Sequence, residues 1–186
     1  MESLFETFKA RAEAVSAEVH RFPTRQGAFG FILGLLKEQQ VLEGPQGGAL
    51  WAPGSFLDGA ARERLEGEAP GIGFQVTREA AAAARVGISQ ADWGIAATGT
   101  LVADAAPVEQ RLVSTLPPIH VALARTGRIL PDLAGAMDHL DPARSAYLSF
   151  ITGPSRTADI ERVLTIGAHG PERLIVVFVD DPERGQ

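Results

Sequence analysis

The feature that most constrains the fold of this chain is a set of short apolar runs with the length of buried strands. Residues 119–124, 146–151 and 174–179 are such runs, and Val, Ile and Phe recur in them. Segments with the apolar spacing of helices lie between the runs. Because strands that alternate with helices pair in a sheet covered by those helices, we predict an α/β fold with a parallel or mixed sheet.

Further helices and short strands are expected along the rest of the chain. The expected helices span residues 3–20, 26–40, 60–66, 78–86 and 131–139, and the fourth is capped by Thr77 and ended by Gly87. The expected short strands are 71–76, 95–97 and 101–103, with a tight glycine turn between the last two. A chain of 186 residues can bury its own core, and we expect one domain, 1–186.

The charge and cysteine content exclude several classes of function. The formal net charge is −6 and no run of basic residues occurs, which argues against nucleic acid as the main partner. The 186 residues include no cysteine, which excludes disulfides, thiolate nucleophiles and cysteine-bound zinc or iron–sulfur clusters. We therefore expect no cofactor bound through cysteine and leave any other cofactor open.

Metal binding and membrane insertion are not expected either. The four histidines show neither the His-x-x-His nor the His-Glu-x-x-His spacing of metal sites. The first residues lack the basic and then apolar order of a signal peptide, and no apolar stretch reaches the roughly 20 residues that span a bilayer. We expect a cytoplasmic protein.

A loop between two of the apolar runs is the strongest candidate for a binding site. Gly153 and Pro154 break the chain, Ser155 or Thr157 can cap a following helix, and Arg156 adds a positive charge. Asp159 either fixes Arg156 or a water molecule, or only favours the helix dipole. We predict that residues 153–157 bind an anion. The alternative is an ordinary helix cap with a surface ion pair.

Two further segments are expected to meet this loop at the carboxyl ends of the strands, where ligands of such sheets bind. Thr98, Gly99 and Thr100 form a small polar turn, which binds through backbone amides or is a plain hairpin. The second segment is the region just before His120, and Arg111, which precedes it, contacts an anion or is a solvated surface charge.

Two histidines are the candidates for catalysis, and the catalytic residues are otherwise unknown. His120 lies inside an apolar run, and His169 lies in a loop near the end of the chain. They can pair as acid and base because histidine titrates near neutral pH, but a buried, hydrogen-bonded histidine is the alternative for His120. His20 and His139 are expected on helix surfaces. No phosphate-binding loop, dinucleotide fingerprint or nucleophile elbow occurs.

Three segments together resemble a known family. Residues 91–100, residues 116–121, and residues 153–161 with 169–171 occur in the order found in LUD-domain proteins of the LutC (YkgG) type. The resemblance covers residues 71–186, which are expected to form the α/β core, whereas residues 1–70 match weakly and are expected to be helical. Ala97 stands where the family usually has a glutamate, so a carboxylate nucleophile is absent at that position.

The resemblance implies a fold and a role. It implies a three-layer α/β/α fold similar to that of NagB/RpiA sugar-phosphate isomerases and CoA transferases. It also implies a component of L-lactate oxidation to pyruvate that acts with iron–sulfur partner proteins. From the loop itself we expect this component to bind an anionic small molecule at residues 153–157. The alternative is a stand-alone enzyme or metabolite-binding module for a phosphorylated or carboxylated small molecule, by analogy with isomerases, CoA transferases and formyltetrahydrofolate cyclo-ligases.

Overall fold

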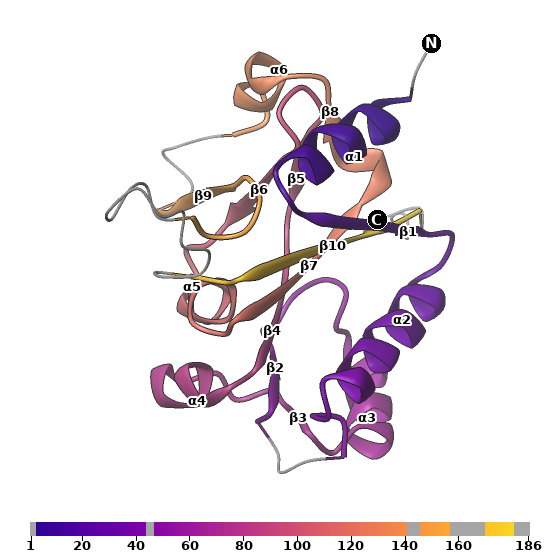
Figure 1. Ribbon diagram of the computed structural model, residues 1–186, viewed down its shortest axis with the longest axis vertical. Coiled ribbons are helices and arrows are strands. Elements are labelled where there is room, and N and C mark those ends of the chain that lie inside the picture. Colours follow the sequence, from indigo (N-terminus) through magenta and orange to yellow (C-terminus); the bar gives the residue numbers. More distant parts are fainter. Residues whose placement is uncertain (1–2, 44–46, 141–145, 157–169, 181–186) are drawn as a thin grey trace.

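A computed structural model of the chain describes residues 3–43, 47–140, 146–156 and 170–180. Its centre is a six-stranded parallel sheet with the strand order β1-β10-β7-β4-β2-β3, and a four-stranded sheet, β8-β5-β6-β9, lies beside it (Figure 1). The strands of the parallel sheet are β1 (Glu18–Phe22), β2 (Ala49–Trp51), β3 (Ile72–Gly73), β4 (Val86–Gln90), β7 (Ile119–Arg125) and β10 (Arg173–Val179). The predicted α/β class is therefore confirmed.

The two central strands form the core. β7 and β10 pair in parallel along their whole length, from Arg173 opposite Ile119 to Val179 opposite Arg125. Nearly all of their side chains are buried, as their apolar sequences predicted. Alternate residues of β10 face opposite layers, because successive side chains of a strand point to opposite faces. Val177 packs in one apolar cluster and Phe178 in another.

Helices cover both faces of the parallel sheet. On one face, α2 (Arg25–Glu38) and α3 (Gly59–Glu68) pack their apolar sides in the cluster that contains Val177. On the other, α1 (Leu4–Ala14) packs Phe8 edge-on against Phe178, with ring centroids 5.0 Å apart. α4 (Arg78–Ala83) and α5 (Val108–Thr115) pack near β2 and β4. The expected helices at 26–40 and 60–66 are confirmed.

The second sheet extends from the parallel one. β4 continues into β5 (Trp93–Ile95), and β7 continues through the short helix η1 (Thr126–Arg128) into β8 (Ile129–Leu130). β6 (Thr100–Asp104) pairs antiparallel with β5, which confirms the expected strand at 101–103. The strand expected at 95–97 lies earlier, at Trp93–Ile95, and residues 96–99 form the turn. The prediction for residues 146–151 was wrong in one respect. They contribute β9 (Leu148–Ile151), a partly exposed strand of the second sheet that pairs antiparallel with β6.

The amino-terminal part differs from the expected single helix at 3–20. α1 ends at Ala14, Ser16 has a positive φ of 70°, and β1 follows. Residues 18–22 form a strand because they pair with β10, a tertiary contact that overrides a local helical pattern. Residues 1–70 are therefore not simply helical, and His20 lies in β1 instead of on a helix, with its ring tilted against that of Phe31 at a centroid distance of 4.4 Å.

Other predicted boundaries also moved. Thr77 caps α4 as expected, but the helix ends at Ala83, and Gly87 lies within β4 instead of ending a helix. A Cβ at Gly87 would lie 1.9 Å from the carbonyl oxygen of Val113, so close packing of α5 requires glycine there. The predicted strand 71–76 is reduced to β3, and the helix expected at 131–139 is the shorter α6 (Leu133–Met137).

Candidate functional site

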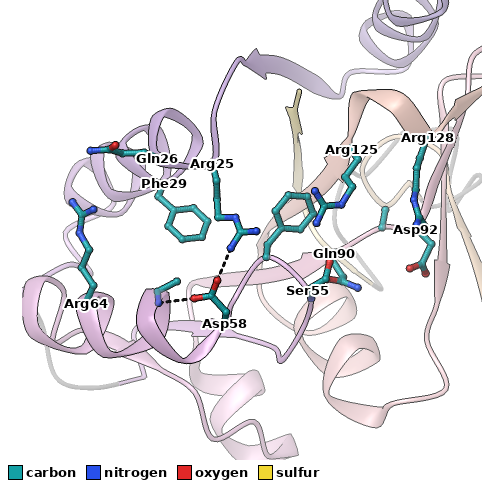
Figure 2. Close-up of a pocket in the computed structure, with 13 residues that line it drawn as sticks. Arg25, Gln26, Phe29, Ser55, Asp58, Arg64, Gln90, Asp92, Arg125 and Arg128 are labelled. Atoms are coloured by element: carbon teal, nitrogen blue, oxygen red, sulfur yellow. Dashed lines mark hydrogen bonds and ion pairs between the residues drawn. The ribbon is translucent and has the colours of Figure 1, made fainter. Parts of the chain in front are cut away.

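A pocket of about 870 Å³ opens at the carboxyl edge of the parallel sheet (Figure 2). Gln90 is the last residue of β4, Arg125 is the last of β7, and Arg25 follows β1 and begins α2. Ligands of open α/β sheets bind at this edge, because the loops that follow neighbouring strands meet there. The other lining residues are Gln26, Phe29, Ser55, Phe56, Asp58, Ala61, Arg64, Ala91, Asp92 and Arg128.

The pocket is positive although the chain is acidic. Four arginines and two aspartates line it, whereas the formal net charge of the chain is −6. Two of the arginines are paired with carboxylates: Arg25 with Asp58 at 2.8 Å and Arg64 with Glu68 at 2.9 Å. Arg125, at the end of β7, has no carboxylate partner within the described residues, so the excess of positive charge lies at that end of the pocket.

Arg125 is the best-placed anion ligand of this pocket. Its guanidinium carbon lies 4.8 Å from the ring centroid of the buried Phe56, and no acceptor within the described residues bonds it. Arg128 is stacked in the same way over Trp93, at 4.9 Å. Stacking on Phe56 fixes the plane of the Arg125 guanidinium and leaves its N–H edge available, which suits Arg125 to bind a carboxylate or phosphate.

Gln90 adds a neutral donor beside Arg125. Its Oε1 accepts hydrogen bonds from the backbone nitrogen of Ser55, at 2.6 Å, and from Ser55 Oγ, at 3.2 Å. Because a backbone N–H can only donate, the bonded atom must be the oxygen, which defines the orientation of the amide. Its Nε2 has no acceptor within the described part of the chain. A Cβ at Gly54 would lie 2.4 Å from Oε1, so a larger residue there would force the Gln90 side chain to shift.

Asp92 contributes a carboxyl group to the lining of the pocket. Its backbone nitrogen donates to the carbonyl oxygen of Val102 at 2.8 Å, and its Oδ2 accepts from the backbone nitrogen of Asp104 at 2.7 Å. Burial raises the pKa of the Asp92 carboxyl, while the bond from Asp104 and the charge of Arg128 act in the opposite direction. A carboxyl with a raised pKa in a pocket is suited to proton transfer.

The structure brings two of the predicted segments together. The hydroxyl of Thr100 bonds those of Thr98 and Thr152, each at 2.7 Å. Gly99 and Gly153 have positive φ angles of 64° and 71°. Both lie against the end of α1: a Cβ would lie 2.4 Å from the nitrogen of Ala12 at Gly99, and 2.6 Å from the carbonyl oxygen of Val15 at Gly153.

These segments lie at the amino ends of the parallel strands, so their expected convergence at the carboxyl ends was wrong. The nitrogen of Ser155 donates to the carbonyl oxygen of Pro171, just before β10, at 2.8 Å. Arg156 donates to the carbonyl oxygen of Val15 at 2.7 Å and to Ser16 Oγ at 2.9 Å, just before β1. The placement differs because β9 belongs to the second sheet. The described residues that follow β9 therefore lie beside the start of β10.

Three predicted residues, Thr157, Asp159 and His169, lie outside the described residues, as does the helix expected after Gly153. Anion binding by residues 153–157 stays a prediction. Within the described part, both side-chain contacts of Arg156 join the loop to the α1–β1 turn.

Arg111 and His120 do not line the pocket. Arg111 donates to the carbonyl oxygens of Ala105 and Ala106 and stacks on Tyr147. These contacts stabilise the segment that leads into α5. His120 is buried, with its Nε2 2.7 Å from the hydroxyl oxygen of Ser89. Burial lowers the pKa of His120 from 6.5 to about 4, so the imidazole is neutral at physiological pH.

Comparison with known proteins identifies the family. The profile of the LUD domain matches residues 5–179, nearly the whole chain. The chain belongs to the LUD-domain family. Among solved structures, this LUD-domain chain resembles a DUF162 family protein from Deinococcus radiodurans, with a TM-score of 0.63, 17% identity and coverage of 95% of this chain and 96% of that one. This likeness supports the α/β fold.

Several bacterial proteins are related in sequence. Lactate utilization protein C of Exiguobacterium sp. is 36% identical over 113 residues, 58% of this chain and 49% of that protein. The uncharacterized protein YkgG of Escherichia coli is 30% identical over 130 residues, 64% of this chain and 56% of that protein. Uncharacterized protein NMB1437 of Neisseria meningitidis is 36% identical over 96 residues, 50% of this chain and 41% of that protein. The LUD-domain chain spans about half the length of the curated relatives it matches.

The residues that line the pocket of this LUD-domain chain were not among those predicted from the sequence. Arg125 directly follows the predicted strand 119–124, so its place at a carboxyl strand end was available from the sequence. No predicted strand pointed to Gln90, Ser55 or Arg25 in this way, because only the order of the strands in the sheet brings them together. In the described ranges, no cluster of three or more potential metal ligands occurs. Nor does any described helix combine the length and apolar character needed to cross a bilayer.

Proposed function

We propose that this LUD-domain chain acts in L-lactate utilisation as a component that binds an anionic small molecule. The observation that carries the proposal is its 36% identity, over 113 residues, to a protein named Lactate utilization protein C. The arginine-lined pocket supports it, because a partly buried guanidinium without a carboxylate partner is stabilised by a bound anion.

We place the anion in the carboxyl-edge pocket and not at the Gly153 loop. Arg125 has no acceptor within the described residues, whereas Arg156 already donates two hydrogen bonds to the α1–β1 turn. Gln90 Nε2 adds a second donor beside Arg125. A small carboxylate held by Arg125 and Gln90 is the minimal ligand of this arrangement.

The redox chemistry of lactate oxidation is proposed to lie in partner proteins. This chain of 186 residues contains no cysteine and therefore offers no thiolate ligand for an iron–sulfur cluster. Iron–sulfur partner proteins, which the family resemblance implies, would carry the electrons. Purification of the tagged protein from its native host tests this step, and recovery without any iron-containing partner under lactate-grown conditions counts against it.

Growth on L-lactate tests the proposed role. A deletion strain is expected to lose this growth and to regain it with the wild-type gene. The Arg125→Ala gene should not restore growth of the deletion strain. The Arg78→Ala gene should restore it, because Arg78 is exposed on α4 outside the pocket. Undiminished growth of the deletion strain on L-lactate as sole carbon source would overturn the proposal.

Asp92 favours a second candidate, a stand-alone enzyme that transfers a proton to or from its ligand. The carboxyl lines the pocket, and its pKa is raised by burial. The test is deuterium exchange into the methyl group of pyruvate in D₂O, followed by NMR. The wild-type protein should accelerate exchange and Asp92→Asn should not. An exchange rate equal to that of buffer alone excludes this chemistry for pyruvate.

A further inference from the structure

The pocket is large compared with a ligand of the size of lactate. At about 870 Å³ it lies in the upper part of the roughly 300–1,000 Å³ range of pockets that enclose drug-sized molecules. A molecule as small as lactate would fill only one end of such a space. The rest of the pocket leaves room for a ligand that carries more atoms beyond its anionic group.

The donors at the positive end suit a phosphate better than a carboxylate. A carboxylate is planar, and one guanidinium fork satisfies both of its oxygens. A phosphate has three terminal oxygens and needs donors from several directions. Arg125 at the end of β7 and Gln90 at the end of β4 approach the pocket from two neighbouring strands.

The opposite wall of the pocket offers an apolar surface. Phe29 of α2 packs edge-on against Trp51, with ring centroids 5.0 Å apart, and lines the pocket next to Ala61 of α3. Figure 2 shows its ring between Arg25 and Arg64, on the side away from Arg125. Both of these arginines have carboxylate partners, so this wall carries less uncompensated charge than the Arg125 end.

We propose that the pocket binds an organic phosphate, with its phosphate against Arg125 and Gln90 and its organic part along Phe29. The inference rests on the proposed anion-binding function and specifies the class of ligand for the same pocket. It predicts that neither half of the ligand alone binds as tightly as the whole, because each half contacts only one wall.

Isothermal titration calorimetry with ADP, ribose 5-phosphate, pyrophosphate, adenosine and L-lactate tests this inference on the full chain. At least one of the two organic phosphates is expected to bind about tenfold or more tighter than pyrophosphate, and adenosine should not bind measurably. Phe29→Ala should weaken the organic phosphate about tenfold and leave pyrophosphate affinity within about twofold. Arg78→Ala, exposed on α4 outside the pocket, is the matched surface control and should change nothing.

Gln90→Glu is the sharpest variant for the phosphate end. Glutamate keeps an oxygen that accepts from the Ser55 nitrogen, so the loop contact is retained, but it replaces the donor Nε2 by an acceptor. The phosphate affinity should fall about tenfold or more, and Arg125→Ala should act in the same direction. Retention of the wild-type circular dichroism spectrum shows that either variant still folds.

Three results would overturn the inference. Equal affinity for pyrophosphate and both organic phosphates would show that the organic part makes no contact. Unchanged organic-phosphate affinity in Gln90→Glu would show that the phosphate does not bind beside Gln90. Binding of L-lactate alone, lost in Arg125→Ala, would refute the organic phosphate and leave the proposed function intact. Failure of every anion to bind would contradict both.

Discussion

The buried His120 makes the stability of this LUD-domain protein depend on pH in a defined window. Burial lowers its pKa from 6.5 to about 4, and its hydrogen bond to Ser89, at 2.7 Å, is inside the sheet. The unfolded chain takes up a proton near pH 6.5, but the folded protein does so only near pH 4. The stability is therefore fully present above pH 6.5 and falls as the pH falls through that window.

The size of the effect follows from the width of the window. One pKa unit corresponds to about 1.36 kcal/mol, so the limiting loss below pH 4 is about 3 kcal/mol. Between pH 7 and pH 5, the linkage relation gives a loss of about 2 kcal/mol from this one side chain. A loss of this size is a substantial fraction of the roughly 5–15 kcal/mol that stabilises an ordinary domain.

Urea unfolding of the wild-type protein and His120→Gln at pH 7, 6 and 5 measures this contribution. Glutamine can bond the Ser89 hydroxyl but does not titrate. The variant should lose about 2 kcal/mol less than the wild type between pH 7 and pH 5. His20, whose pKa burial lowers, and Asp92, whose pKa burial raises, are present in both proteins and cancel in the difference. Identical pH slopes in the two proteins would refute the reasoning.

Three further substitutions test contacts of the fold and the pocket. Gly87→Ala places a Cβ 1.9 Å from the carbonyl oxygen of Val113 and should lower the urea-unfolding free energy by about 1–3 kcal/mol or more. Thr100→Val removes the buried hydroxyl that joins Thr98 and Thr152 and should cost about 1–3 kcal/mol in the same assay. Gly54→Ala forces the Gln90 side chain to shift and should weaken pyrophosphate binding, measured by calorimetry, with little effect on stability because the loop is on the surface.

Matched substitutions control these predictions. Gly30→Ala lies in α2, where a Cβ meets no atom within 4 Å, and should stabilise the helix by about 0.5–1 kcal/mol. Thr98→Val changes the exposed partner of Thr100 and should cost less than Thr100→Val. A Gly87→Ala protein as stable as the wild type would show that α5 can move away from β4. Unchanged pyrophosphate affinity in Gly54→Ala would show that the contact between this loop and Gln90 does not contribute to binding.

Much of the fold could be predicted because its signals are local. The runs at 119–124 and 174–179 are strands in the structure because near-continuous apolar side chains suit a strand buried on both faces. Thr77 caps α4, with its hydroxyl accepting from the nitrogen of Ala80 at 3.1 Å. The errors at 3–20 and 146–151 have one cause: the partner of a strand decides its sheet and its limits, and that partner lies far away in the chain.

The sequence by itself determined the α/β class, the central strands and the resemblance to the LUD-domain family, because apolar periodicity, caps and motifs are properties of neighbouring residues. Only the tertiary structure decided where the candidate site lies. Arg25, Ser55, Gln90 and Arg125 follow or end four different strands, and they meet because the sheet aligns the carboxyl ends of those strands at one edge. The Gly153 loop has the stronger motif, yet its contacts with residues just before β1 and β10 place it at the opposite edge.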